Sequence, residues 1–341
     1  MIWAAVGVCR WFIMARLYNR KIYVTIGPEV GTNTVVVMPG TLRTTFDVKK
    51  TVASQPNKAT IQIFNLNRES RAKVDTPGNI ITVRAGYADD VGYDYGTSEM
   101  FMDMAESLPI VTRADIVRTT HRRSGADFVT EIQAGEGDQA YRMAVVDKKL
   151  NSEISIVDVF AYLRDMLAIT QISTVTKLPI DRGFSVNPDF EKVIALATTN
   201  AKSAHLAEAT AVYSGFFKSG LTLFGHAYDV FDALALRHDL FWFLDNNVLT
   251  VVPINGYMEA GVSGPWGPMN GVHGIPERQE NGAVAVKMNL TPGVVPWSKQ
   301  ELLMEINTEL NGKYKTGTVS HVGDSDSAGE FTTSWEGFQL A

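Results

Sequence analysis

The chain has 341 residues, of which 45% are hydrophobic and 20% charged, and its formal net charge is −6 at pH 7. This composition is that of a globular protein with room for two or three domains, and it excludes a largely disordered chain. The modest acidity argues against sequence-independent binding of DNA or RNA, which needs a basic surface to neutralise phosphates. The single cysteine, Cys9, excludes an intramolecular disulfide and a Cys-rich zinc site.

The first residues, MIWAAVGVCRWFIM, are apolar but lack the basic start and the length of a signal peptide or a membrane span. Two interpretations stay open. Translation could start at Met14, or the segment could be an apolar arm that docks on a neighbouring subunit. We treat residues 1–14 as an N-terminal extension or mis-called start, and we expect no membrane insertion by this chain.

Residues 15–138 are expected to be nearly all β-strand. The clearest segment is Thr41–Asn67, where Leu42, Thr44, Phe46 and Val48 share one face of a strand and the turn SQPN leads to a second strand. No side chain of this hairpin suggests chemistry, so we interpret it as scaffold. Further strands are predicted at Lys21–Ile26, Thr34–Met38, Asn79–Ala85, Ile110–Arg118 and Asp127–Ala134. Their short spacing is typical of a small barrel or sandwich.

The segment 89–106 has six carboxylates and no Lys or Arg. It lacks the alternating acidic ladder of an EF-hand, so we interpret it as a solvated or interface loop rather than a calcium site. Its methionines and Phe101 are adaptable apolar groups, suited to a protein contact.

Helical patterns appear in residues 139–255. Ser155 is a good N-cap, with Asp158 three residues on, and apolar residues from Ile156 to Leu167 recur at helical spacing. A second helix is predicted after Gly225, followed by a hairpin of Phe241–Leu244 and Val248–Val252. A helix over 188–197 is less well defined by its sequence.

Residues 256–341 return to strands and loops. Strands are predicted at Ala283–Leu290, Leu302–Ile306, Tyr314–Val322 and Glu330–Phe338. The predicted fold class is α+β, mainly β, with a first β domain at 15–138, an α/β insert at 139–255 and a second β domain at 256–341.

The candidate site residues of this sequence have simpler structural interpretations. The six histidines, at positions 121, 205, 226, 238, 273 and 321, form no pair at metal-ligand spacing. His226 and His238 flank the second helix and are expected to cap or decorate its ends. The segment from His321 to Asp326 resembles a metal cluster but is interpreted as a polar hairpin loop.

The basic cluster of Arg118, His121, Arg122 and Arg123 is interpreted as a solvated turn, since no aromatic side chain interleaves with it. Hydrolase, phosphate-loop, dinucleotide and zincin motifs are absent from the sequence. We therefore predict no catalytic, cofactor-binding or metal site.

Several segments together resemble baseplate hub proteins of contractile-tail bacteriophages. LRTTFDVKKTVASQPNKATIQIFNLN is similar to the opening β-domain of that family, ITVRAGY to its next strand, and ADFVTEIQAGEGDQAYR to the end of its first barrel. Later matches are SGLTLFGHAYDVFDALALRHDLFWFLDNNVLTVVP, GVHGIPERQENGAVAVKMNLTPGVVP and GKYKTGTVSHVGDSDSAGEFTTSWEG. The likeness runs in order from about residue 15 to the C-terminus, and residues 88–108 and 171–212 depart from the family pattern.

The resemblance implies two tail-tube-like β-barrel domains that flank the insert, in a homotrimeric ring between the hexameric tail tube and the trimeric spike. It implies a structural virion protein, assembled in the host cytoplasm, that contacts tube, spike, tape measure protein and other baseplate components. DNA would be passing cargo only. The sequence ends after the last strand signal, so no fused lytic domain and no enzymatic activity are expected.

Two alternatives stay open. One is a peptidoglycan-degrading tail enzyme that uses a pair of carboxylates. The other is the hub of a related contractile secretion or injection system, which shares the barrels.

Overall fold

The computed structural model describes residues 19–28, 35–51, 55–87, 107–172, 179–181, 185–186, 216–217, 219–246, 248–258 and 262–340. The predictions for residues 1–14, for the acidic segment 89–106 and for a helix over 188–197 lie outside these residues, as does His205. In the described part of the chain, no helix is long and apolar enough to cross a membrane.

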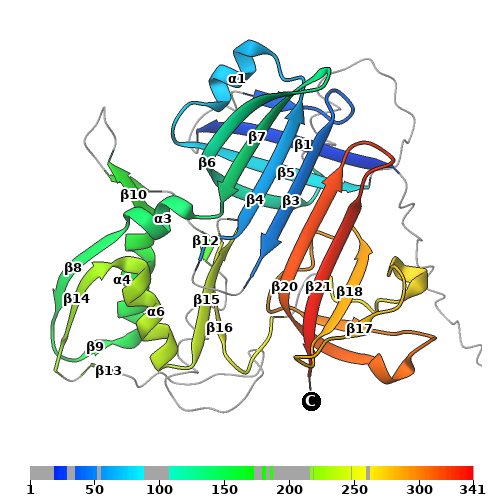
Figure 1. Cartoon of the computed structure of the whole chain (residues 1–341). Helices are drawn as coiled ribbons and strands as arrows, with labels where there is room; N and C mark the ends of the chain where they lie inside the picture. The colour runs from blue at the N-terminus through cyan, green and yellow to red at the C-terminus, as the bar shows by residue number, and fades with distance from the viewer. Residues whose placement is uncertain are drawn as a thin grey trace, which may run out of the picture.

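A twelve-stranded antiparallel sheet dominates the fold (Figure 1). Its strands, in order across the sheet, are β17 (Glu277–Arg278), β18 (Val284–Asn289), β21 (Phe331–Gln339), β20 (Gly312–Asp324), β3 (Thr44–Lys50), β4 (Lys58–Phe64), β7 (Asp127–Gly135), β6 (Ile110–Ser124), β5 (Asn79–Tyr87), β1 (Arg20–Pro28) and β2 (Val35–Val37). The twelfth strand, β19 (Lys299–Leu302), pairs with β20. The mainly β character expected from the sequence is confirmed.

The strands from β1 to β7 form the first β region, and those from β17 to β21 form the second. The two regions meet where β3 pairs with β20. In this register Val48 lies opposite His321, and Phe46 lies opposite Gly323. Figure 1 shows the C-terminal strands, in orange and red, beside the blue β3. In the part of the chain that the structure describes, the pairings run as an open path from β17 to β2. A closed barrel is not found there, so the expectation of two barrels is not confirmed.

Alternation of apolar and polar residues explains most of the strands. In β3 the residues Thr44, Phe46, Val48 and Lys50 are buried, and the intervening Asp47 and Lys49 are exposed. The core of the first β region also includes Phe331 from β21, so the two β regions share apolar contacts. A separate C-terminal core contains Trp335 and other buried residues of the last strands.

The residues between the two β regions, 138–253, are called the insert below, and they contain a separate apolar core. Its main elements are α3 (Asp138–Met143), β8 (Val145–Leu150), α4 (Ile156–Ala168), β14 (Leu221–His226), α6 (Ala227–Arg237), β15 (Leu240–Asp245) and β16 (Val248–Pro253). Shorter strands are β9 (Ile154–Ser155), β10 (Ile169–Ile172), β11 (Pro179–Asp181), β12 (Ser185–Val186) and β13 (Phe216–Phe217). Phe160 of α4 and Phe231 of α6 meet edge to face, with ring centroids 5.0 Å apart.

The two predicted helices and the hairpin that follows them are confirmed. Ser155 precedes α4, and its Oγ accepts a hydrogen bond from the Asp158 backbone N–H at 3.2 Å, as expected of an N-cap. His226 and His238 occupy the N-cap and C-cap positions of α6, and the His226 side chain makes no capping bond.

Three elements differ from the sequence-based expectations. The helix α1 (Arg68–Val74) is capped by Asn67 but buries only Val74, so it carries no apolar periodicity to recognise. The strand β6 extends through His121 and Arg123 to Ser124, so this basic cluster is not a turn. The predicted strand Leu302–Ile306 is wrong, because β19 ends at Leu302 and the Asn311 side chain bonds the backbone N–H and C=O of Met304. Two 3-10 turns, η2 (Pro268–Asn270) and η3 (Thr308–Leu310), flank this strand in the chain.

Candidate functional site

A buried lysine lies where the first β region meets the insert. Lys50 is the last residue of β3, on the same face as Phe46 and Val48, and its side chain has no exposed surface. Because side chains alternate along a strand, this position points the ammonium group into the protein rather than into solvent. A buried charge is costly unless it is paired.

Two carboxylates pair with this lysine. The Lys50 Nζ lies 2.5 Å from Oδ1 of Asp245, at the end of β15, and 3.5 Å from Oε1 of Glu136, which follows β7. The Glu136 side chain is also fully buried, and that of Asp245 is 16% exposed. The three charges therefore come from the first β region and from the insert.

Neutral groups complete the arrangement around Glu136. Asn57 donates from Nδ2 to Glu136 Oε2 at 2.9 Å and to the Leu244 carbonyl at 3.0 Å. Thr112 donates from Oγ1 to Glu136 Oε1 at 2.7 Å. We call Lys50, Asn57, Thr112, Glu136 and Asp245 the Lys50 cluster. Its hydrogen bonds fix the orientation of the Glu136 carboxyl group.

The electrostatics of the cluster follow from its burial. Burial alone would lower the pKa of Lys50, but the charges of Asp245 and Glu136 and their hydrogen bonds outweigh it, so the pKa is raised. Burial raises the pKa of Glu136 and the neighbouring Asp245 adds to the effect, although Lys50 opposes it. Lys50 thus stays cationic, and Glu136 takes up a proton more readily than a surface glutamate.

His321 is buried in the seam between β3 and β20. Its Nδ1 lies 2.9 Å from the Thr333 hydroxyl of β21. Burial, with a smaller contribution from the charge of Lys50, lowers the pKa of His321 to about 3. The imidazole is therefore neutral at physiological pH. The expectation that His321 belongs to a polar hairpin loop is wrong, since it lies inside the sheet.

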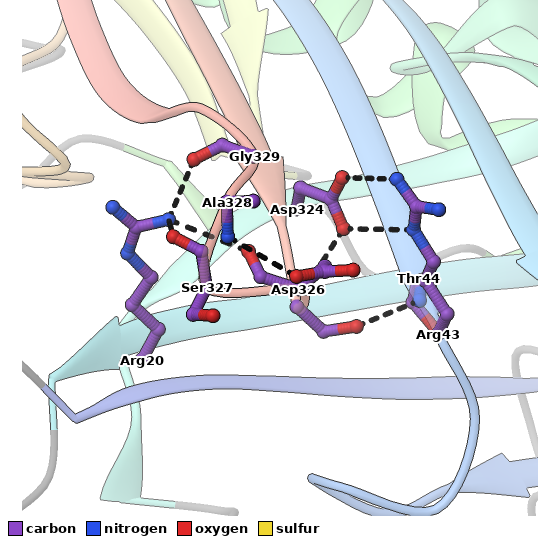
Figure 2. Close-up of polar contacts among 9 residues, drawn as sticks. Arg20, Arg43, Thr44, Asp324, Asp326, Ser327, Ala328 and Gly329 are labelled. Carbon is purple, nitrogen blue, oxygen red and sulfur yellow. Dashed lines mark hydrogen bonds and ion pairs between the residues drawn. The ribbon is translucent and has the colours of Figure 1, made fainter.

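A second polar junction joins the β20–β21 hairpin to the first β region (Figure 2). Arg43 donates to both Asp324 oxygens, from Nη2 at 2.8 Å and from Nε at 3.3 Å. Asp324 also accepts the Asp326 backbone N–H at 2.9 Å, which shapes the turn. Arg20 of β1 donates to the Gly329 carbonyl, in the loop between β20 and β21, at 2.6 Å. The hairpin is thus held by Arg20 of β1 and by Arg43, which directly precedes β3.

The structure disperses the groups that the sequence suggested as candidate ligands. His321 lies in the sheet, and Asp326 lies in the turn beyond Asp324. His121 of the basic cluster contacts Asp75 and Thr130, and Arg122 lies 3.6 Å from Glu131. In the described ranges, no three His, Cys, Asp or Glu side chains group as metal ligands.

The Lys50 cluster was missed in the sequence. Every second residue of β3 from 44 to 50 faces inward, so the position of Lys50 in this alternation already indicated a buried charge. Glu136 and Asp245 had no such signal, because both lie just at or beyond strand ends and approach Lys50 only in the folded chain. Since Lys50 and Glu136 are closed to solvent, the cluster joins parts of the chain and does not receive a diffusing substrate.

No protein-family model matches the sequence, and no curated protein matches it. Solved structures do share its fold. A tail protein from Neisseria meningitidis MC58 aligns with a TM-score of 0.54 and 8% sequence identity, over 95% of this chain and 97% of that one. The 43 kDa tail protein of prophage MuSo2 from Shewanella oneidensis aligns with a TM-score of 0.55 and 9% identity, over 94% of this chain and 98% of that one. The chain therefore has the fold of these tail proteins along nearly its whole length.

Proposed function

We propose that this chain is a structural subunit of a bacteriophage tail, a baseplate hub that forms a homotrimeric ring between the hexameric tail tube and the trimeric spike. The observation that carries the proposal is the shared fold with two tail proteins, one of them from a prophage, over nearly the full length of each chain. The ordered run of hub-like segments in the sequence supports it independently of the fold. At this level of identity, function rests on both together.

The architecture supports an adaptor role. Two β regions lie in one sheet through the β3–β20 pairing, so each chain would offer two β units held in a fixed relation. Three chains would then present six such units, barrel-like in the assembled ring, to a sixfold tube. The Lys50 cluster and the Arg43–Asp324 contact hold insert, first β region and closing hairpin together. Such an adaptor must be rigid.

The proposed location is the virion tail, with assembly in the host cytoplasm. The partners are further copies of this chain, the tube, spike and tape measure proteins and other baseplate components. DNA passes through the axial channel, and a net charge of −6 suits a wall that must release a polyanion. In this role the chain has no enzymatic activity.

The test is a native mass measurement of the purified chain, alone and mixed with its tail tube partner. We expect three times the chain mass of 37.5 kDa, and a larger complex when the tube protein is added. A monodisperse monomer in the presence of tube and spike proteins would contradict the proposal, as would an assembled tail that lacks this chain at its axis.

A peptidoglycan hydrolysis assay distinguishes the hub role from the enzymatic alternative. The hub role predicts no turnover by the purified chain. Turnover that one Asp or Glu substitution abolishes would favour a tail hydrolase instead. A neighbouring gene for a β-helical spike of a secretion system would favour the related injection machine.

A further inference from the structure

We propose that Lys50 and Asp245 become joined covalently in the folded protein, through an amide bond between the lysine Nζ and the aspartate carboxyl carbon, with Glu136 transferring the protons. This cross-link does not depend on the proposed function. It would tie the end of β3 to the β15–β16 hairpin of the insert.

The geometry places the reacting groups together before any reaction. The Lys50 Nζ lies 2.5 Å from Asp245 Oδ1, and the lysine side chain is fully enclosed. The two residues are 195 positions apart in sequence, so it is the folding of the chain that brings them together. Holding the two groups in hydrogen-bond contact replaces a bimolecular encounter by an intramolecular one.

The carboxylate of Glu136 lies close enough to the lysine to transfer a proton. Glu136 Oε1 lies 3.5 Å from the lysine Nζ, and Thr112 and Asn57 hold the carboxylate by hydrogen bonds. Burial raises the pKa of Glu136, and a raised pKa makes a carboxylate a stronger base. The arrangement is thus a nucleophile, an electrophile and a base in one enclosed site.

The chemistry is a condensation that balances without any other reactant. A proton passes from the Lys50 ammonium to Asp245, giving a neutral amine and a neutral carboxyl group. The amine attacks the carboxyl carbon, and the Glu136 carboxylate takes a second proton from nitrogen. Glu136 then gives that proton to the departing hydroxyl group, which leaves as water. The products are one amide, one water molecule and the original Glu136 carboxylate.

Burial favours the product. An ion pair in a protein interior has lost the hydration of both charges, and this cost is only partly recovered by their attraction. Condensation replaces the ammonium and the Asp245 carboxylate by a neutral amide, which removes the desolvation cost of these two charges. Glu136 then loses its neighbouring cation, and burial, which already raises its pKa, favours its uptake of a proton once the amide has formed. The cationic state of Lys50 sets the barrier, because the amine must first lose a proton to Asp245. We therefore expect a slow reaction, in which freshly folded protein holds the ion pair and prolonged incubation converts it to the amide.

The primary test is the intact mass of the purified full-length chain under denaturing conditions. We expect a mass below that of the sequence by one water molecule. Tryptic digestion should yield residues 50–58 linked to residues 238–278, because the modified Lys50 is no longer a cleavage site. An intact mass equal to that of the sequence, after prolonged incubation of the folded protein, would overturn the proposal.

Variants separate the cross-link from other losses of water, such as cyclisation of an aspartate onto its own backbone. Lys50→Arg keeps the charge but cannot form this amide, so its mass should equal that of its sequence. Glu136→Gln should likewise retain its full mass. Asp245→Ala lacks the carboxyl group and should also retain its full mass. A Lys50→Arg chain that remains one water molecule light would overturn the proposal.

Discussion

Gly323 of β20 lies directly opposite Phe46 of β3, and the aromatic ring fills the space where a side chain at Gly323 would be. A Cβ built on Gly323 would come within 2.3 Å of the Phe46 ring atoms Cε1 and Cζ. The seam between the two β regions therefore depends on this glycine for close packing.

Gly323→Ala is accordingly expected to destabilise the fold. The added methyl group must displace a buried aromatic ring, and overpacking of this kind typically costs about 1–3 kcal/mol. Chemical denaturation of both proteins would measure the change in the free energy of unfolding. Gly317→Ala is the matched control in the same strand, because its nearest neighbour is the Glu336 carbonyl at 3.7 Å. Equal effects of the two substitutions would contradict the predicted packing.

Lys50→Ala should be among the most destabilising substitutions in β3. In freshly folded protein, before any cross-link forms, it leaves Glu136 and Asp245 with no cation between them, and removing one partner of a buried ion pair costs roughly 3–5 kcal/mol. Lys49→Ala, one position along on the exposed face, should be close to neutral. Urea unfolding midpoints of the two variants make the comparison, and a large effect at Lys49 with none at Lys50 would refute the inward orientation of Lys50.

Local pattern predicted most single elements but not how they are joined. Alternation identified β3 and β4, and the Ser155 cap with apolar periodicity identified α4, because these signals depend on neighbouring residues. The pairing of Phe46 with Gly323 leaves no such local signal, because register between distant strands is set by the folded core.

Leu302–Ile306 shows the reverse error. Its run of apolar residues favours a strand, yet Ile306 is 65% exposed, and Asn311 takes both backbone hydrogen bonds of Met304. The Lys50 cluster could be predicted from the sequence only in part. The parity of Lys50 could be read from the sequence, and its partners could not, since Glu136 and Asp245 reach it through tertiary structure alone.

His321 should make the protein sensitive to acid. Its pKa is about 3 in the folded state against 6.5 as the ordinary value, so the unfolded chain binds the proton more readily. The stability that the neutral imidazole provides is complete above pH 6.5 and is lost as the pH falls toward 3. At roughly 1.4 kcal/mol per pKa unit, the loss across that range amounts to several kcal/mol.

Urea unfolding between pH 7 and pH 4 would test this dependence. His321→Asn should be less stable at pH 7 but should lose less stability on acidification than the wild type. Glu136 acts in the opposite direction, since its raised pKa favours the folded state at lower pH, and it is present in both proteins. The difference between them therefore isolates the histidine. His273→Asn, at an exposed loop position, should follow the wild-type curve. Parallel curves for wild type and His321→Asn would contradict the buried, neutral imidazole.

The Arg43–Asp324 contact should be asymmetric in its energetics. Arg43 is 48% exposed, and the median exposed ion pair contributes about 0–1 kcal/mol, so Arg43→Ala should have a small effect. Asp324 is only 12% exposed and also accepts the Asp326 backbone N–H that shapes the turn. Asp324→Ala therefore removes both the ion pair and a turn bond, and hydrogen bonds to charged groups contribute about 1.5–3 kcal/mol.

Asp324→Asn distinguishes the two contributions, because its amide oxygen can still accept the Asp326 N–H after the charge is lost. We expect its free energy of unfolding to lie close to that of Arg43→Ala and above that of Asp324→Ala. Thermal or urea unfolding of the three variants measures the order. If Arg43→Ala proved as damaging as Asp324→Ala, the ion pair rather than the turn would hold the hairpin against the first β region. Raising the salt concentration would then weaken the wild type as well, since exposed pairs are screened by ions.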